Sequence, residues 1–333
     1  MAGVSLVELM ISMVLGMIVI AALVTVFAST SAARNELERT SRQIENGRFA
    51  MELISDDLRV AGFYGELNVL QVAPAASLLD PCSTNVADWT SAINLPVQGY
   101  DNGASAPGCI PASLKAGTDI LIVRRAATCE AGIGSCPAVV ANTPYFQVSK
   151  CSTESAATPF SIGMQGTATF ALRARNCTAT AGLRQYVVHI YFVSTNNGSG
   201  QPIPTLKRLE FNGTTFVEAP LVEGIEELNI EYGIDNDGDG APNAYTTNPS
   251  TYTYAGCLAC NAWDNWANVV TARVSLLARN VDASPNYTDT KTYSLGLDAT
   301  GAAVTVTPGG AYRRHVYSGL VRVVNASQRR ERP

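Results

Sequence analysis

The feature that most constrains this chain is an uncharged apolar segment close to its start. From Leu9 to Ala33 there are 25 consecutive residues without a charged side chain. About 20 apolar residues suffice for a helix to cross a bilayer. A cleaved secretory signal would have basic residues before a shorter apolar core and a cleavage site after it. No basic residue precedes this segment, and a helical pattern follows it without a loop, so we favour a retained transmembrane helix over residues 9–33.

A polar segment with heptad spacing follows directly. One series of residues recurs every seven positions and a second lies three positions after it, namely Leu37, Ile44, Met51 and Leu58 with Thr40, Gly47, Ile54 and Ala61. Such a stripe is typical of an amphipathic helix, here over residues 34–62, that packs on its own domain. Pro is absent before residue 74, while Gly62 and Gly65 are stop signals. We therefore predict one helix over residues 4–64, about 90 Å long at 1.5 Å per residue.

Glu8 is an acidic side chain next to the apolar segment. A carboxylate costs about 2.5–3.5 kcal/mol at the centre of a membrane and less near its surface. Two interpretations remain open. Glu8 stays at the level of the lipid headgroups, or a cation from another chain, such as a free α-amine, is its partner.

Composition disfavours several classes of function. Charged residues make up 15% of the 333 residues and the net charge is −5, so no nucleic-acid partner is expected. The sequence has no nucleophile elbow, zinc-protease motif, P-loop or Rossmann fingerprint, and we predict no enzymatic activity. His189 lies in an alternating segment, where a hydrogen-bonded sheet histidine is the expected role. His315 follows two arginines at the start of the last expected strand, again without a nucleophile motif.

The remainder, residues 65–333, has the pattern of a β-rich domain. Short β-branched or aromatic segments alternate with Gly, Pro, Asn and Ser clusters. The expected strands are Asp119–Arg125, Tyr145–Ser149, Thr167–Ala174, Gln185–Ser194, Leu206–Phe211, Leu228–Tyr232, Val269–Ala278, Thr292–Leu297 and His315–Val324. Residues 74–111 are expected to form a long loop. The fold class is thus α+β, with one long helix laid across a mainly antiparallel sheet.

All eight cysteines follow residue 80, which indicates disulfide bonds formed in an oxidising compartment. Proximity in the sequence suggests the pairs Cys82–Cys109, Cys129–Cys136, Cys151–Cys177 and Cys257–Cys260. The last pair is a C-x-x-C motif, for which a redox or a zinc role is the alternative. A redox motif would need a βαβ context, and a zinc site would need a second ligand pair. Neither is apparent, so we favour structural disulfides.

A run of acidic residues follows one expected strand and has the spacing of a calcium loop. Asp235, Asp237 and Asp239 occupy positions 1, 3 and 5, and Gly240 occupies position 6. The remaining candidate ligands are the carbonyl of Ala241 at position 7, Asn243 at position 9 and, outside the loop, Glu231. Position 12 is Thr246 rather than Glu, so the loop is not an EF-hand. Ca²⁺ is therefore the possible cofactor, and a solvated turn without a metal is the alternative.

The segment from Gly3 to Met10, GVSLVELM, resembles the class III signal of type IV prepilins. The resemblance implies that a prepilin peptidase cuts between Gly3 and Val4 and that the new amine of Val4 is methylated. It also implies that Glu8 is an assembly carboxylate, matched to the amine of a neighbouring subunit. Since only Met-Ala-Gly precedes the cut, we expect the start codon to lie upstream.

A second block, Gln43–Gly65, is similar to the helix of PilW-type minor pilins, as are Gly117–Arg125, Leu221–Asp239 and Val269–Asn280. This resemblance implies a type IV pilin-like fold and a minor pilin that primes pilus assembly, at the pilus tip with other minor pilins and in contact with the major pilin. It further implies a single-pass protein of the inner membrane with a periplasmic domain, which then enters the extracellular pilus of a Gram-negative bacterium. A J-type pseudopilin of a type II secretion system and a calcium-dependent adhesin carried on the pilus are the alternatives.

Overall fold

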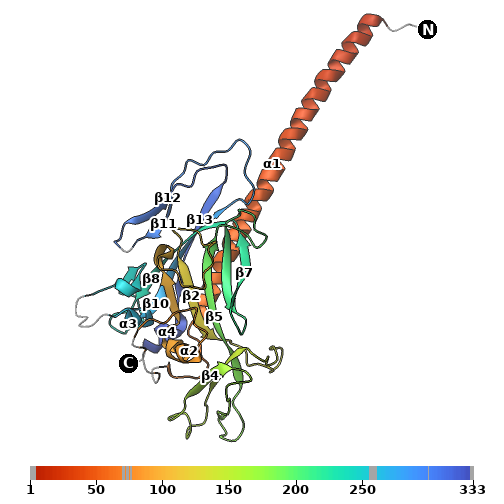
Figure 1. Ribbon diagram of the computed structural model, residues 1–333. Helices are drawn as coiled ribbons and strands as arrows, with labels where there is room; N and C mark the ends of the chain where they lie inside the picture. Colours follow the sequence, from red (N-terminus) through yellow and green to blue (C-terminus); the bar gives the residue numbers. More distant parts are fainter. Residues whose placement is uncertain are drawn as a thin grey trace.

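One helix, α1 (Leu6–Val60), extends far beyond the rest of the molecule in this computed structural model (Figure 1). The structure describes residues 5–69, 72, 75, 77–254, 261–298 and 300–330. At the start of α1, the Glu8 carboxylate accepts a hydrogen bond from the backbone N–H of Ser5 at 2.9 Å, which satisfies one of the free donors of the first turn. At its end, the Asn325 side chain donates to the Ala61 carbonyl at 3.1 Å.

The two halves of α1 have different surroundings. All residues from 5 to 35 are exposed. Farther along, the buried residues of the helix are Gln43, Gly47, Ala50, Ile54, Ser55, Asp57 and Leu58. These residues face the β-domain, where α1 contacts chiefly β13 (Arg314–Arg322) and β10 (Val269–Arg279). Among the described helices, α1 is the one that is long and apolar enough to cross a membrane.

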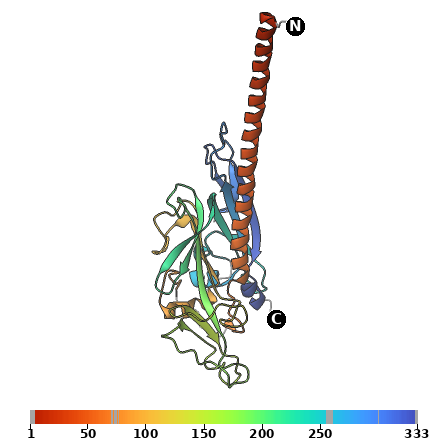
Figure 2. The same cartoon turned by 90° about the vertical axis from the view of Figure 1, so that its right-hand side faces the viewer.

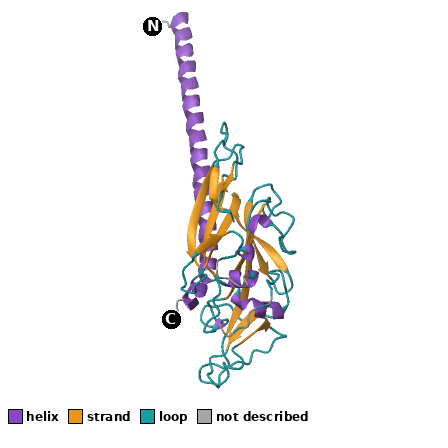
Figure 3. Ribbon diagram, turned by 90° about the vertical axis from the view of Figure 1, so that its left-hand side faces the viewer, coloured by secondary structure: helices purple, strands orange, loops and turns teal. Residues whose placement is uncertain are grey.

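Beside α1, the strands form two main sheets (Figures 2 and 3). The larger sheet contains β1 (Val97–Tyr100), β2 (Ile120–Ala126), β5 (Leu183–Ser194), β3 (Pro144–Val148), β4 (Phe160–Met164), β6 (Thr205–Phe211) and β7 (Phe216–Glu223). The smaller has the order β13, β10, β8 (Ile225–Ile234) and β9 (Ala244–Thr246). A separate hairpin consists of β11 (Tyr293–Leu297) and β12 (Ala303–Val306). All of these strand pairs are antiparallel.

Alternation along the strands gives the larger sheet two apolar faces. On β5, Tyr191 and Val193 point into a core shared with α1 and the smaller sheet. The intervening Ile190 and Phe192 point into a second core on the opposite face. That second core is covered by residues that follow α1, such as Trp89 of α2 (Val86–Ser91). The domain is therefore layered, and α1 lies against only one of its cores.

Short helical segments complete the chain. They are α2, η2 (Ala92–Asn94), η3 (Asp101–Gly103), η4 (Pro249–Thr251), α3 (Ala262–Ala267) and α4 (Val324–Arg330). Three of them, with β1, lie in the region 74–111, where the sequence predicted only a long loop. The fold class, α+β with a long N-terminal helix and antiparallel sheets, is confirmed, although the strands form two main sheets rather than one.

The prediction of a strand at Thr167–Ala174 is wrong. The chain turns there, because Gly166 has a φ of +102° and the N–H of Ala168 bonds back to the Met164 carbonyl at 2.9 Å. The strand is instead β4, Phe160–Met164, which pairs with β3. Its Ser161 and Gly163 weaken the β pattern in the sequence. The strands β1, β7, β9 and β12 were also not predicted.

The prediction that the heptad stripe is the buried face of α1 is partly correct. Gly47, Ile54 and Leu58 are buried as expected. Leu37 and Ile44, by contrast, are 70% and 45% exposed. The buried face of α1 is rotated away from them toward Gln43 and Ala50, because the helix lies between the two sheets rather than across one.

Three disulfide bonds lie in the loops of the domain, and they are the pairs that sequence proximity suggests. They join Cys82 to Cys109, Cys129 to Cys136 and Cys151 to Cys177. The fourth suggested pair, Cys257–Cys260, lies outside the described residues. The loops between residues 127 and 180 occupy the end of the domain that is farthest from the N-terminus (Figure 1).

Candidate functional site: the acidic loop and the N-terminal helix

The acidic loop connects β8 to β9 as the turn of a hairpin. Its ends are closed by a hydrogen bond from the Asn243 N–H to the Ile234 carbonyl at 2.8 Å. The backbone N–H of Asp235 donates to the Asn268 carbonyl at 3.0 Å, which ties the loop to the start of β10. The loop is thus held at both ends by regular structure.

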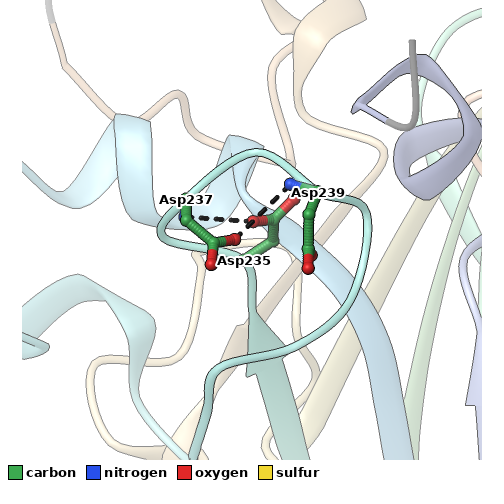
Figure 4. Close-up of side chains that lie close together, drawn as sticks. All are labelled: Asp235, Asp237 and Asp239. Atoms are coloured by element: carbon green, nitrogen blue, oxygen red, sulfur yellow. Dashed lines mark hydrogen bonds between the residues drawn. The ribbon is translucent and has the colours of Figure 1, made fainter. Parts of the chain in front are cut away.

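Asp235 organises the interior of this loop (Figure 4). Its carboxylate is fully buried and accepts hydrogen bonds from the backbone N–H groups of Asp237, Gly238 and Gly240, at 3.2, 2.6 and 3.0 Å. Gly238 and Gly240 have φ values of +81° and +85°, which side chains other than glycine rarely adopt. The two glycines therefore allow the backbone to wrap around one carboxylate.

Asp237 and Asp239 bring two more carboxylates to the same place. One oxygen of each of the three aspartates lies within 4.8 Å of the others. The Asn243 side chain donates to Asp237 at 3.1 Å, and this hydrogen bond lowers the pKa of Asp237. Hard oxygen ligands of this kind fit a divalent cation such as Ca²⁺.

The other ligands considered in the sequence have different surroundings. Glu231 is buried and forms an ion pair with Arg273 at 2.8 Å, and it accepts the N–H of Leu297 at 3.1 Å. It is therefore occupied within the smaller sheet and its hairpin. Thr246 ends β9 and pairs with Tyr232. The Ala241 N–H donates to Asp239 at 2.7 Å, so Ala241 takes part in the loop through its backbone.

The first turn of α1 carries the candidate assembly residue. Glu8 is exposed, and its carboxylate bonds to the N–H of Ser5 in the same chain. The expected cleavage position, Gly3 and Val4, lies outside the described residues. Glu8 is thus presented to the surroundings at the end of the helix farthest from the domain (Figure 1).

Polar contacts fix α1 where it meets the domain. Glu36 accepts hydrogen bonds from Ser284, at 2.8 Å, and from Arg313. Two turns farther along, the Gln43 side chain donates to the Ala278 carbonyl at 2.9 Å. The exposed part of the helix is therefore continuous with a part that is held by groups next to the end of β10 and the start of β13.

A buried charge cluster near the end of α1 was not predicted. The Asp57 carboxylate contacts His189 Nδ1 at 2.6 Å, Arg125 Nε at 2.7 Å and the Tyr191 hydroxyl at 2.9 Å. Burial raises the pKa of Asp57, but the hydrogen bonds and charges of His189 and Arg125 outweigh it and hold this pKa well below its usual value. His189 is thus a hydrogen-bonded sheet histidine, as the sequence suggests, and its partner is on the helix. His315 is exposed and contacts Tyr317 edge-on.

Comparisons with known proteins give two similarities. Residues 190–325, from β5 to α4, match the family model of type IV pilus-assembly protein W, PilW. A type IV-like pilin from Thermus thermophilus is 15% identical, covers 65% of this chain and 80% of its own, and has a TM-score of 0.27. The comparison with curated proteins found no match. With a long apolar N-terminal helix on antiparallel sheets, the family match supports a PilW-type pilin.

Proposed function

We propose that this protein is a minor pilin, a structural and non-catalytic subunit that is anchored in the inner membrane and then enters a type IV pilus. One observation carries the proposal. The first half of a 55-residue helix is apolar and exposed, while the second half is fixed to its own domain. Such a helix is suited to leave lipid for a bundle of similar helices.

Glu8 has the assembly role in this proposal. Prepilin peptidase cuts between Gly3 and Val4 and the new amine of Val4 is methylated. In the membrane interior an unpaired carboxylate is costly, so the amine of a neighbouring subunit stabilises Glu8 once the helices bundle. Together with other minor pilins, this subunit starts the fibre ahead of the major pilin and stays at its tip.

Mass spectrometry of the N-terminal peptide tests this proposal. We expect a methylated Val4 terminus in fibres detached from the cells. The same terminus confined to the membrane fraction would favour a J-type pseudopilin of a type II secretion system. An uncut N-terminus would contradict the proposal.

A matched pair of variants tests Glu8 itself. Glu8→Ala should abolish incorporation into fibres, because the helix loses its charged partner. Glu38→Ala is the control, since Glu38 is an exposed glutamate of the same helix that forms an ion pair with Arg42 one turn away. Fibres that form normally with Glu8→Ala but lose surface binding would support the adhesin alternative instead.

We infer that the acidic loop is a Ca²⁺ site that stabilises this domain. The convergence of the three carboxylates within 4.8 Å supports it, since their mutual repulsion is relieved by a cation. The ligands would be Asp235, Asp237 and Asp239, with the Ala241 carbonyl, the Asn243 side chain and water.

Thermal unfolding with Ca²⁺ and with a chelator tests the site. Ca²⁺ should raise the melting temperature, and Asp237→Asn should remove the increase. Asp298→Asn is the control, because Asp298 is a half-buried turn aspartate that accepts hydrogen bonds from the N–H groups of Thr300 and Ala302 outside the acidic loop. Equal melting temperatures with Ca²⁺ and with chelator would exclude the site.

A further inference from the structure

Strand β13 forms an open edge of the smaller sheet. Among the described strands it pairs with β10 alone, in uninterrupted register from Arg314 to Arg322. A long unpaired edge is a template for another strand, and proteins usually protect such edges with proline, a bulge or a short strand. β13 has nine residues, no proline and no bulge.

The hydrogen bonds at the two ends of β13 show which backbone groups face outward. The Val323 N–H donates to Val270, and the Arg313 carbonyl accepts from Asn280. Odd-numbered residues therefore bond to β10, and in an antiparallel pair the even-numbered residues point the other way. The outward backbone groups are those of Val316, Ser318 and Leu320.

The position of β13 relative to α1 follows from contacts around Gly47. On one side of Gly47, Asn46 donates to the Glu223 carbonyl at the end of β7. Gly47 itself lies against the Tyr317 ring of β13. Because successive helix residues are about 100° apart, β13 lies about 100° around α1 from the β7 contact, and Ile44 and Leu37 lie farther round in the same direction.

Apolar side chains of α1 project beyond β13 on that side. Met51 lies close to Gly319, with its Sδ 3.5 Å from where a Cβ would stand. Ile44, one heptad earlier, is 45% exposed, and Leu37, two heptads earlier, is 70% exposed. On the outer face of the strand, Leu320 is 60% exposed. A strand added to this edge would thus be covered by Ile44 on one side and by Leu320 on the other.

We propose that the free edge of β13 binds an extended segment of a neighbouring pilus subunit by strand addition. This inference rests on the proposed function as a pilin. The partner of this edge is a neighbouring subunit, because the exposed side chains of Leu37 and Ile44 continue the apolar half of α1. The subunits are proposed to assemble through that apolar half. β13 contains no acidic residue, and the charge of Arg48 acts on Tyr317, so an acidic side chain in the added strand fits this edge. Backbone pairing supplies affinity and the flanking side chains supply specificity.

Hydrogen–deuterium exchange with single-residue resolution tests this inference. The full chain is compared in detergent micelles and in detached fibres. The outward N–H groups of Val316, Ser318 and Leu320 should exchange rapidly in micelles and at least tenfold more slowly in fibres. The inward N–H groups of Tyr317 and Gly319 should be protected in both, which makes them an internal control.

Each other outcome has a definite meaning. Rapid exchange of the outward groups in fibres that contain the chain would overturn the strand addition and leave the pilin function intact. Protection already present in micelles, with a dimer by light scattering, would overturn it in favour of pairing between two copies. Absence of the chain from the fibres would overturn both the strand addition and the proposed function.

A pair of variants at one position provides a second test. Leu320→Pro removes an outward N–H without removing a bond to β10, as edge strands tolerate. Leu320→Ala removes the same apolar side chain and keeps the N–H. Incorporation into fibres should fall severalfold more with Pro than with Ala. Equal incorporation, with the Pro variant folded by circular dichroism, would contradict the backbone pairing.

Discussion

Gly47 of α1 and Tyr317 of β13 approach so closely that a Cβ on residue 47 would lie 2.1 Å from the Cε2 atom of the tyrosine ring. No two carbon atoms can be so close without a bond, so the helix and the strand have this spacing because residue 47 lacks a side chain. The glycine is therefore a packing requirement of the helix–sheet contact.

Gly47→Ala should destabilise the domain, although alanine is the better helix former. Overpacking of a well-packed core costs about 1–3 kcal/mol, which exceeds the gain in helix propensity of about 1 kcal/mol. Chemical unfolding of the full chain in detergent measures the loss. Gly16→Ala is the control, because a Cβ there meets no atom within 4 Å. Equal stability of both variants would contradict the close contact.

Asp57→Ala should cost much more than the same change one residue earlier. Asp57 is 6% exposed, and its removal leaves Arg125 and His189 without their carboxylate. Breaking such a buried pair costs about 3–5 kcal/mol. Asp56→Ala breaks only an exposed pair with Arg59, which contributes little. Similar midpoints of denaturation for the two variants would show that the cluster does not stabilise the helix–sheet contact.

The buried carboxyl group of Asp119 should make the stability of the domain depend on pH. It accepts the N–H of Asn102 at 2.8 Å and that of Ile230, on β8, at 2.7 Å, so it links the two main sheets. Burial raises the pKa of Asp119 to about 7, against the effect of these two donors. The folded state then holds a proton that the unfolded state loses near pH 4, and stability falls as the pH rises from about 4 to about 7.

The measurement is the free energy of unfolding at pH 5 and pH 7.5. Asp119→Asn does not titrate, so its stability should change less between these two values than that of the unaltered chain. An unchanged difference in the variant would assign the pH dependence to other groups.

The disulfide bonds should differ in what their removal costs. The bond between Cys82 and Cys109 spans 27 residues, whereas that between Cys129 and Cys136 spans 7. On the chain-entropy model, loss of the first costs about 3–4 kcal/mol and loss of the second about 2–3 kcal/mol. Double Cys→Ser variants and denaturant unfolding measure both. Thiol labelling of the unfolded, unreduced chain should find no reactive cysteine among these residues.

The sequence predicts α1 well because its signals are local. An uncharged apolar segment, the absence of proline and the glycines after Ala61 suffice for bounds close to Leu6–Val60. Which side of the helix is buried depends on two sheets that form far along the chain. Leu37 and Ile44 fit the heptad rule as well as Leu58 does, yet they lie at the margin of the contact.

The candidate site divides in the same way. The acidic loop is contiguous in the sequence, so spacing alone predicts Asp235, Asp237 and Asp239 as a group. The structure places these three residues together. The Asp57–His189 pair joins residues 132 positions apart, and strand alternation could identify only the histidine. The sequence gives no signal for its partner, because Asp57 lies outside the predicted heptad stripe and its burial follows from the rotated face of α1. A buried carboxylate on a helix needs a cation or a histidine opposite it as a partner.

The long contact between α1 and the β-domain also determines how the subunit carries mechanical load. The first cysteine in the sequence is Cys82, so the helix is attached to the domain covalently only through its end near Ala61. Tension applied at the N-terminal end of α1 would act parallel to the contact, so we expect the bonds of Glu36, Gln43 and Asp57 to yield together rather than one after another. Such loading in parallel resists rupture far better than peeling.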